Sequence, residues 1–158
     1  MKEIKLTQGM VAIVDDGMFD DLNRFKWYAA KNGRNFYACR HVRLGKKEKQ
    51  VRIQMHQMIL NPGPGLETDH IDGDGLNNQM LNLRVATRSQ NGCNRRTQRG
   101  TSKYKGVHWH KSSNKWMTRV MKDGERLFLG LFLNEIDAAL SYDAAARKFH
   151  GEFARTNF

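Results

Sequence analysis

The sequence predicts an α+β protein in which short strands form small sheets and a few helices pack against them. Residues 1–60 hold short stretches of strand character that glycines interrupt. Residues 66–94 read as a strand, a polar loop, a second strand and a short helix. Residues 104–158 hold three strands of alternating type and then an alanine-rich helix. We therefore expect a β-rich N-terminal region, a strand–loop–strand–helix unit, and a three-stranded antiparallel sheet packed on one helix.

The first region is expected to contain four strands and a short helix. KEIKL and MVAIVDD have strand character, and NFYACRHVR and KQVRIQMH look like two strands joined at LGKKEK, a glycine-containing turn. In DDLNRFKWYA, Asp20 or Asp21 can cap a helix on which Leu22, Phe25 and Trp27 share one face. MHQMIL begins a helical turn that stops at NPGPG, which holds both prolines of the chain.

The next two regions are read in the same way. LETDHI and NLRVAT are short strands on either side of the polar loop DGDGLNNQML. RSQNGCN then turns helical, with Thr87 or Ser89 as its N-cap. YKGVHWH, KWMTRVMK and RLFLGLF are strands separated by SSN and DGE. In KWMTRVMK, alternate residues from Trp116 share one face and those from Met117 share the other. The following helix starts at the cap Asn134 and ends before Gly151.

The charge of the chain indicates a polyanionic partner. Its formal net charge is +11, from 27 basic and 16 acidic residues. Between Asp74 and Asp123 every charged residue is basic, and no acidic residue offsets the repulsion within that segment. Nucleic acid is the usual polyanion, and an anionic membrane surface is the second possibility. No basic amphipathic helix is evident in the segment, so a membrane surface is the less favoured partner.

Several other classes of protein are disfavoured. No apolar run approaches the ~20 residues that span a bilayer, and MKEIKLTQGM has no signal-peptide core, so we expect a cytoplasmic protein. Cys39 and Cys93 are far apart and outside any CxxC pair, which argues against a disulfide framework and a zinc knuckle. An RNA-binding module shares the charge but lacks the corresponding motifs.

The stretch TDHIDGDGLNN, residues 68–78, crowds a histidine among oxygen-bearing side chains. A calcium loop of the EF-hand type fails in both registers, because Leu76 or Ile71 falls where an oxygen ligand is needed. Phosphodiester hydrolysis fits better. It needs a neutral histidine to activate water, and a hard divalent cation that a few oxygen ligands can hold. Asp69 and His70 point to opposite faces of a strand, so they can do these separate jobs.

These residues, in this order, resemble the HNH endonuclease family with its ββα-metal site. Asp69 and His70 supply the first pair, Asn82 in NQMLNLR falls at the middle position, and Asn91 in TRSQNGCN at the last. The resemblance implies that His70 is the general base, that Asp69 and Asn91 are metal ligands, and that Asn82 ties the loop together. His56 in IQMHQMIL recurs in a phage-like subgroup, where it contacts phosphate or supports the site; simple packing is the competing interpretation.

The same resemblance implies the cofactor and the substrate. We expect one Mg²⁺ or Mn²⁺ ion per site, double-stranded DNA as substrate, and no small-molecule cofactor or membrane. A single site of this kind cuts one strand at a time, so a monomer or weak dimer is expected to nick. The family also implies a phage or mobile-element homing enzyme that works in a bacterial host cell. A DNA-binding regulator that keeps the fold without turnover is the alternative.

Residues 103–158 resemble the DNA-binding domain of plant ethylene-response factors, the APETALA family, through YKGV, KW, LGLF, EIDAALSYDAAA and the final NF. In that family the sheet face reads DNA. Carried over by position, and with the cations of the linker 94–103, the expected DNA-binding residues are Arg95, Arg96, Arg99, Lys103, Lys105, His108, His110, Arg119 and Arg126. Met121 and Phe128 replace an arginine and a tryptophan of the family, which predicts a different sequence preference. The expected domains are 1–93, with a β-rich extension 1–55 and a ββα-metal core 56–93, and 104–158.

Overall fold

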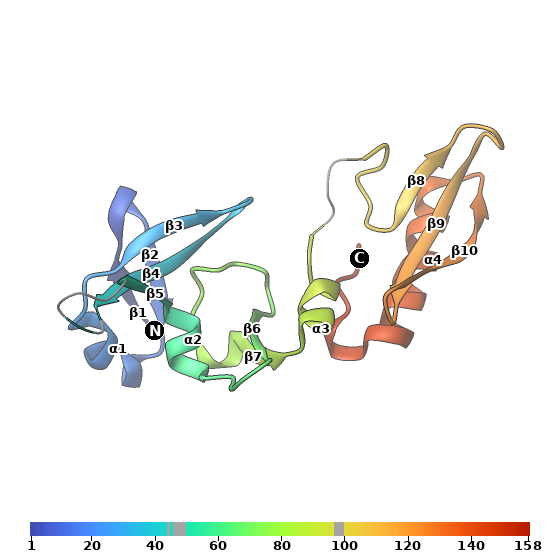
Figure 1. Ribbon diagram of the computed structural model, residues 1–158. Coiled ribbons are helices and arrows are strands. Elements are labelled where there is room, and N and C mark those ends of the chain that lie inside the picture. Colours follow the sequence, from blue (N-terminus) through green and yellow to red (C-terminus); the bar gives the residue numbers. More distant parts are fainter. Residues whose placement is uncertain (44, 46–49, 97–99) are drawn as a thin grey trace. The chain divides into compact units, whose positions relative to one another are not determined.

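A computed structural model of the chain describes residues 1–43, 45, 50–96 and 100–158. The chain divides into two compact units, Met1–Thr87 and Arg88–Phe158, and each is described by itself (Figure 1). Across these residues the fold is mixed α/β, with small antiparallel sheets and four α-helices, as the alternation of short strands and helices predicts. None of the helices in the described ranges combines the length and apolar character that a membrane span requires.

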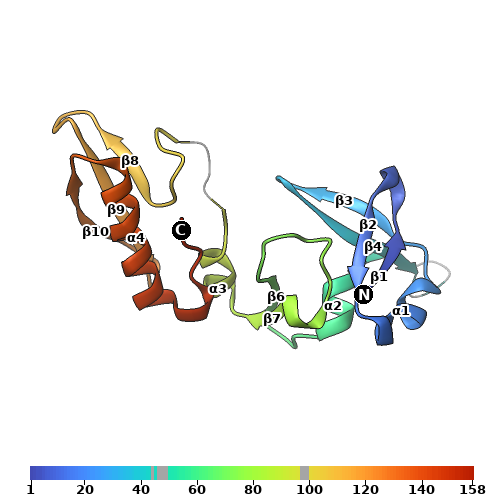
Figure 2. The same ribbon diagram turned by 180° about the vertical axis from the view of Figure 1, so that it is seen from behind.

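The first unit is built on three small sheets. The elements that precede the polar loop are β1 (Lys2–Lys5), β2 (Val11–Val14), α1 (Asp16–Asn23), β3 (Tyr28–Asn32), β4 (Asn35–Arg43), β5 (Gln50–Gln54) and α2 (Met55–Leu60). Strands β1 and β2 form an antiparallel ribbon, and β3, β4 and β5 form a three-stranded antiparallel sheet in that order. Helix α1 follows the ribbon, and α2 follows the sheet (Figure 2).

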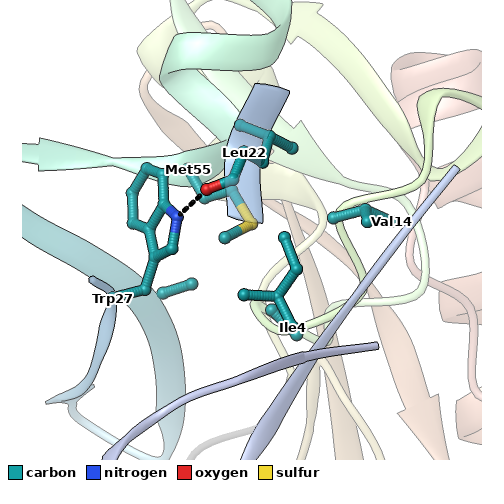
Figure 3. Close-up of a cluster of buried hydrophobic side chains, with 7 residues drawn as sticks. Ile4, Val14, Leu22, Trp27 and Met55 are labelled. Carbon is teal, nitrogen blue, oxygen red and sulfur yellow. Dashed lines mark hydrogen bonds between the residues drawn. The ribbon is translucent and has the colours of Figure 1, made fainter. Parts of the chain in front are cut away.

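One apolar cluster joins the ribbon, both helices and the sheet. Ile4, Val14 and Met55 are at most 2% exposed and lie together with Leu22 and Trp27 (Figure 3). The Trp27 indole Nε1 donates a 2.8 Å hydrogen bond to the Leu22 carbonyl, so the large ring is buried without an orphaned donor. Strands β1, β2 and β4 and helices α1 and α2 all contribute to this cluster, so the N-terminal extension shares one core with the helix that precedes the polar loop, and both belong to the unit Met1–Thr87.

The helix expected at residues 20–29 is wrong in its position. Helix α1 ends at Asn23, and Tyr28 begins strand β3, which was not expected from the sequence. Trp27 shares no helical face with Leu22, because its indole closes the end of α1 and the chain then pairs with β4, Ala29 opposite Ala38. Sheet pairing here overrides helix propensity. The turn expected at 44–49 lies, except for Gly45, outside the described residues.

The polar loop sits between two short paired strands, β6 (Glu67–His70) and β7 (Leu83–Ala86). The loop ends in a single 3-10 turn, Met80–Asn82. In the antiparallel register Asp69 lies opposite Arg84, and His70 lies opposite Leu83. This pairing confirms the two strands expected around the motif.

The second unit is a three-stranded sheet covered on one face by a helix (Figures 1 and 2). Its elements are α3 (Arg88–Cys93), β8 (Val107–His110), β9 (Lys115–Lys122), β10 (Glu125–Phe132), α4 (Glu135–His150) and a 3-10 turn at Gly151–Phe153. On β9, Trp116 and Val120 pack in clusters with α4, and the Thr118 hydroxyl donates to the Ala138 carbonyl. The predicted division of β9 into two faces is therefore confirmed.

The ends of the elements in this unit follow local chemistry. The Asn134 side chain accepts a 2.7 Å hydrogen bond from the Ile136 backbone and caps α4, and Gly151 ends the helix. The β9–β10 hairpin turns at Asp123 and Gly124, whose φ angles of +51° and +86° suit a two-residue turn of type I′. Both caps and the hairpin were predicted from these residues.

Candidate active site

Asp69 is buried in an ion pair. Its side chain is 5% exposed, and Oδ2 accepts hydrogen bonds from Arg84 Nε at 2.9 Å and Nη2 at 2.7 Å. The β6–β7 register brings the two residues directly opposite each other, so the pair follows from the strand pairing. The guanidinium therefore lies directly against a carboxylate that has little contact with water.

His70 lies on the other side of β6, among polar and aromatic side chains. It is 5% exposed, and its Nε2 is 3.4 Å from the Asn78 side-chain oxygen. Its ring centroid is 5.9 Å from that of Tyr37 and 4.7 Å from that of His56. Burial lowers the pKa of His70 below its ordinary value, which keeps the imidazole neutral near pH 7 and able to accept a proton.

His56 is the second histidine of this cluster. It is 4% exposed in α2, stacks edge-on against Tyr37 and His70, and its Nδ1 has no hydrogen-bond partner among the described residues. Burial lowers the pKa of His56 to about 3, so the ring is neutral at physiological pH. A neutral ring adds no positive charge beside His70, and its packing keeps water away from that side.

The loop after His70 is shaped by its own side chains. Asp72 accepts from the Asp74 backbone at 2.8 Å, and Asp74 accepts from the Leu76 backbone at 3.0 Å, two successive Asx turns. The Asn82 amide donates to Asp72 Oδ1 at 3.0 Å and to the Asn77 carbonyl at 2.8 Å, and its oxygen accepts from the Asp72 backbone at 3.1 Å. Asn82 therefore joins the beginning of the loop to its end.

The N-terminal extension holds the outer side of the same loop. Ile13 donates its backbone N–H to the Leu76 carbonyl at 2.9 Å and accepts from the Asn78 backbone at 2.8 Å. The Asp15 carboxylate accepts from the Met80 backbone at 2.7 Å. Gly75 packs so tightly on β4 that a Cβ there would overlap the Phe36 carbonyl and the Tyr37 ring. Residues 1–55 thus support the loop from two directions.

Asn91 and the basic candidates fall in the second unit. Asn91 is half-buried in α3, and Arg95, Arg96 and Lys103 are exposed. Lys105 is partly buried and donates its ammonium to the Cys93 carbonyl, and burial lowers its pKa to about 8. Arg99 lies outside the described residues.

The remaining candidates occur on the sheet face that points away from α4. The register places His108 beside Met117, Phe128 beside Arg119, and Arg126 beside Met121. These positions alternate with the ones that pack on α4, so they share the opposite face. His110 also falls on this face and is paired through Nδ1 with the Ser113 hydroxyl at 2.7 Å. Phe128 is 58% exposed and Met121 45%, so the face combines cations with apolar surface.

Three residues of the site were missed in the sequence. Arg84 could have been found from the hairpin register, because equal spacing from the loop pairs it with Asp69. Asn78 is fully buried, and no local pattern separates it from the loop residue Asn77. Tyr37 comes from β4 and meets both histidines only after the fold has formed, so no sequence spacing marks it.

The donor chemistry of the expected metal ligands suits a hard cation. Asp69 supplies carboxylate oxygens, and Asn91 supplies an amide oxygen; Mg²⁺ and Mn²⁺ prefer oxygen ligands of both kinds. Within the part of the chain that the structure describes, no group of three or more His, Cys, Asp or Glu side chains is placed to hold a metal. Such a group is typical of a closed zinc site, whereas Mg²⁺ is held by one or two protein ligands together with water and phosphate.

Comparison with known proteins gives two kinds of similarity. Residues 62–93 match the family model described as HNH endonuclease. An uncharacterised HNH endonuclease, L560 of Acanthamoeba polyphaga mimivirus, is 32% identical over 157 residues, covering 95% of this chain and 76% of that protein. Protein 3.8 of Escherichia phage T7 is 35% identical over 112 residues, covering 69% of this chain and 91% of that protein. APETALA2-like protein 2 of rice is 44% identical over 62 residues, which are 38% of this chain and 14% of that protein.

Proposed function

The chain belongs to the HNH endonuclease family and is therefore a nuclease that acts on DNA, and from this premise we propose that it nicks double-stranded DNA in a metal-dependent reaction. Members of this family generally depend on a divalent metal. We propose Mg²⁺ or Mn²⁺ for this chain, with one ion at the site. The observation that carries the proposal is a buried, neutral histidine next to a buried carboxylate on one short strand.

His70 is proposed as the general base. The Asn78 Nδ2 donates to the Leu76 carbonyl at 3.0 Å, which turns the Asn78 oxygen towards His70. That oxygen accepts from Nε2–H, so the lone pair is assigned to Nδ1. In this tautomer His70 takes a proton from the attacking water at Nδ1 while Nε2 stays anchored. The packed rings of Tyr37 and His56 limit rotation of the imidazole.

Asp69 and Asn91 are proposed to hold the ion, with Asp69 oriented by Arg84. When bound, a divalent ion supplies charge stabilisation for the phosphate and the departing 3′ oxygen. Arg84 donates two hydrogen bonds to Oδ2 of Asp69, and these bonds limit rotation of the carboxylate about its side-chain bonds. Asn82 keeps the loop closed between β6 and β7, and His56 is proposed to support His70 rather than to react.

The second unit is proposed to bind and position the duplex. Its sheet face carries Arg119 and Arg126 with His108 and His110, and a small sheet of this kind fits the major groove. The similarity of this region to an APETALA2-like protein supports the assignment. We propose a catalytic domain at 1–93, a basic linker at 94–103 that contacts backbone phosphates, and a DNA-recognition domain at 104–158. With one catalytic site, a monomer cuts one strand per encounter.

Relaxation of supercoiled plasmid tests the proposal. Incubation of the full chain with Mg²⁺ should convert supercoiled DNA to the open-circular form, with little linear product at early times. A chelator should stop the conversion, and added Mn²⁺ should restore it. Ends mapped from the nicked plasmid should carry the break in one strand. Plasmid that is bound but stays supercoiled in Mg²⁺ and in Mn²⁺ would overturn the catalytic proposal.

A further inference from the structure

The second unit contains a cavity of about 600 Å³ that the proposed hydrolysis does not use. Its walls come from α3, from the end of β9 with its hairpin, and from the end of α4 with the turn that follows, all inside this unit. Ligand pockets in proteins measure roughly 300–1,000 Å³. The size therefore suits part of a nucleotide chain better than a single ion.

The charge of the cavity is strongly unbalanced. Among the described residues that line it, Asp123 is acidic, and Arg88, Arg95, Lys105 and Lys122 are basic; Arg119 lines it too, but its side chain belongs to the sheet face that points away from α4. None of these four cations takes part in an ion pair with another residue that the structure describes. Like charges gathered without internal compensation repel one another, and an anionic occupant relieves the repulsion.

The floor of the cavity strengthens this field. Tyr142 and Phe153 line it and are 4% and 8% exposed. These buried rings lower the local dielectric on their side of the cavity, so the cations that line it act on an anion more strongly than cations on the open surface do. Burial lowers the pKa of Lys105 to about 8, which leaves the ammonium mostly charged at pH 7, and a nearby anion would raise that pKa again.

We propose that this cavity holds a backbone phosphodiester of the DNA substrate, away from the bond that is cut. The inference rests on the proposed function, since it takes the nuclease's own substrate as the source of the phosphate. Helix α3 forms one wall through Arg88 and Cys93 and also carries Asn91, the proposed metal ligand. A phosphate held in the cavity therefore contacts the helix that carries this proposed ligand.

The first test is the salt dependence of DNA binding, measured in chelator so that no cutting occurs. Lys122 is the test position, and Lys148 is its matched control. Both side chains are exposed, and their ammonium groups lie 5.3 and 5.8 Å from the centre of the Phe149 ring. Of the two, Lys122 alone lines the cavity. Loss of one phosphate contact reduces the slope of log K against log salt by about 1. Lys122→Gln should show this reduction, and Lys148→Gln should keep the wild-type slope.

The second test uses the unmodified chain and the thiol of Cys93. Cys93 lines the cavity and is half-buried, whereas Cys39 is fully buried, so alkylation by iodoacetamide reports on the cavity. A duplex of about two helical turns should slow modification of Cys93 several-fold at low salt, and raised salt should reverse the protection. Inorganic phosphate alone, at the phosphate concentration of the duplex, should protect much less.

The outcomes separate this inference from the proposed function. Equal salt slopes for Lys122→Gln and Lys148→Gln, or alkylation of Cys93 unchanged by duplex, would overturn the phosphate site even if the plasmid is nicked. Protection by inorganic phosphate with none by duplex would also overturn it. Conversely, a reduced slope together with protection, in a protein that never nicks DNA, would leave the cavity assignment intact and remove the catalytic proposal.

Discussion

The two units place the polar side chains proposed to act on DNA in opposite environments. In the first, His56, Asp69, His70 and Asn78 are all at most 5% exposed, and hydrogen bonds or ring contacts hold them in place. In the second, the cations at Arg95, Arg96, Lys103 and Arg126 are exposed. The difference is consistent with the roles proposed for the two units. Reacting groups need a fixed geometry, whereas groups that meet a polyanion can remain in solvent until it arrives.

The sharpest test of this contrast is removal of one carboxylate from each unit. Asp69→Asn removes the negative charge that faces the Arg84 guanidinium, whose side chain is 12% exposed, and should cost about 3–5 kcal/mol of unfolding free energy. Asp137→Asn in the first turn of α4 removes only an exposed charge near a helix start and should cost about 0.5 kcal/mol. Urea denaturation of both variants measures the difference, and similar losses would contradict it.

A second test concerns the packing of the polar loop. Gly75→Ala forces a methyl group into the Phe36 carbonyl and the Tyr37 ring, so the loop has to move; we expect a loss of about 3 kcal/mol and much slower nicking. Gly17→Ala is the control, because nothing lies within 4 Å of its Cβ position in α1 and alanine favours helix. Thermal unfolding should separate the two, and a tolerated Gly75→Ala would show that the loop is not held by β4.

The third test is the pH dependence of stability. His56 has a pKa of about 3 in the folded protein and about 6.5 when unfolded, so between these values the unfolded chain binds more protons. Stability due to His56 is therefore present above pH 6.5 and is lost as the pH falls, by about 2 kcal/mol between pH 7 and 5. The lowered pKa of His70 acts in the same direction.

The matched variant is His56→Gln, which removes the titrating group and keeps a polar side chain of similar length. Urea denaturation at several pH values should give a flatter curve for the variant between pH 7 and 5. An identical curve for both proteins would mean that His56 is not buried as described.

The smallest effect on stability is expected on the sheet face of the second unit. Arg126→Gln should change the free energy of unfolding by less than about 0.5 kcal/mol, because the side chain is exposed. If Arg126 contacts a base, DNA binding should weaken roughly tenfold and discrimination at one position should relax. Binding to a panel of duplexes by fluorescence anisotropy measures this. A large loss of stability would place Arg126 in the fold rather than in recognition.

Local sequence predicted the parts of the fold that local chemistry determines. The Asn134 cap, the Asp123–Gly124 turn and the two faces of β9 all follow from neighbouring residues. Strand β3 was missed because Tyr28–Asn32 has weak strand character of its own and pairs with β4 only in the folded unit. Helix α1 was displaced for the same reason, since Trp27 serves the core instead of extending the helix.

The candidate site divides along the same line. Asp69, His70 and Asn82 are close in sequence and recognisable by their spacing. The residues that orient them are brought to the site by strand pairing and tertiary packing. Arg84 reaches Asp69 through strand register, and Tyr37 and Ile13 reach the site through tertiary packing. The motif thus names the groups proposed to react, and the fold supplies the contacts that fix their rotation and burial.

The measurement that tests the central claim most directly is the single-turnover nicking rate of His70→Ala on supercoiled plasmid with saturating Mg²⁺. His41→Ala is its control, because His41 is a histidine of the same unit whose ring stacks on Tyr28 in the β3–β4–β5 sheet, outside the His56–His70 cluster. Loss of the general base should slow nicking by about 10²–10⁴-fold with DNA affinity nearly unchanged, and His41→Ala should nick normally. A folded His70→Ala protein that nicks at the wild-type rate would contradict the account.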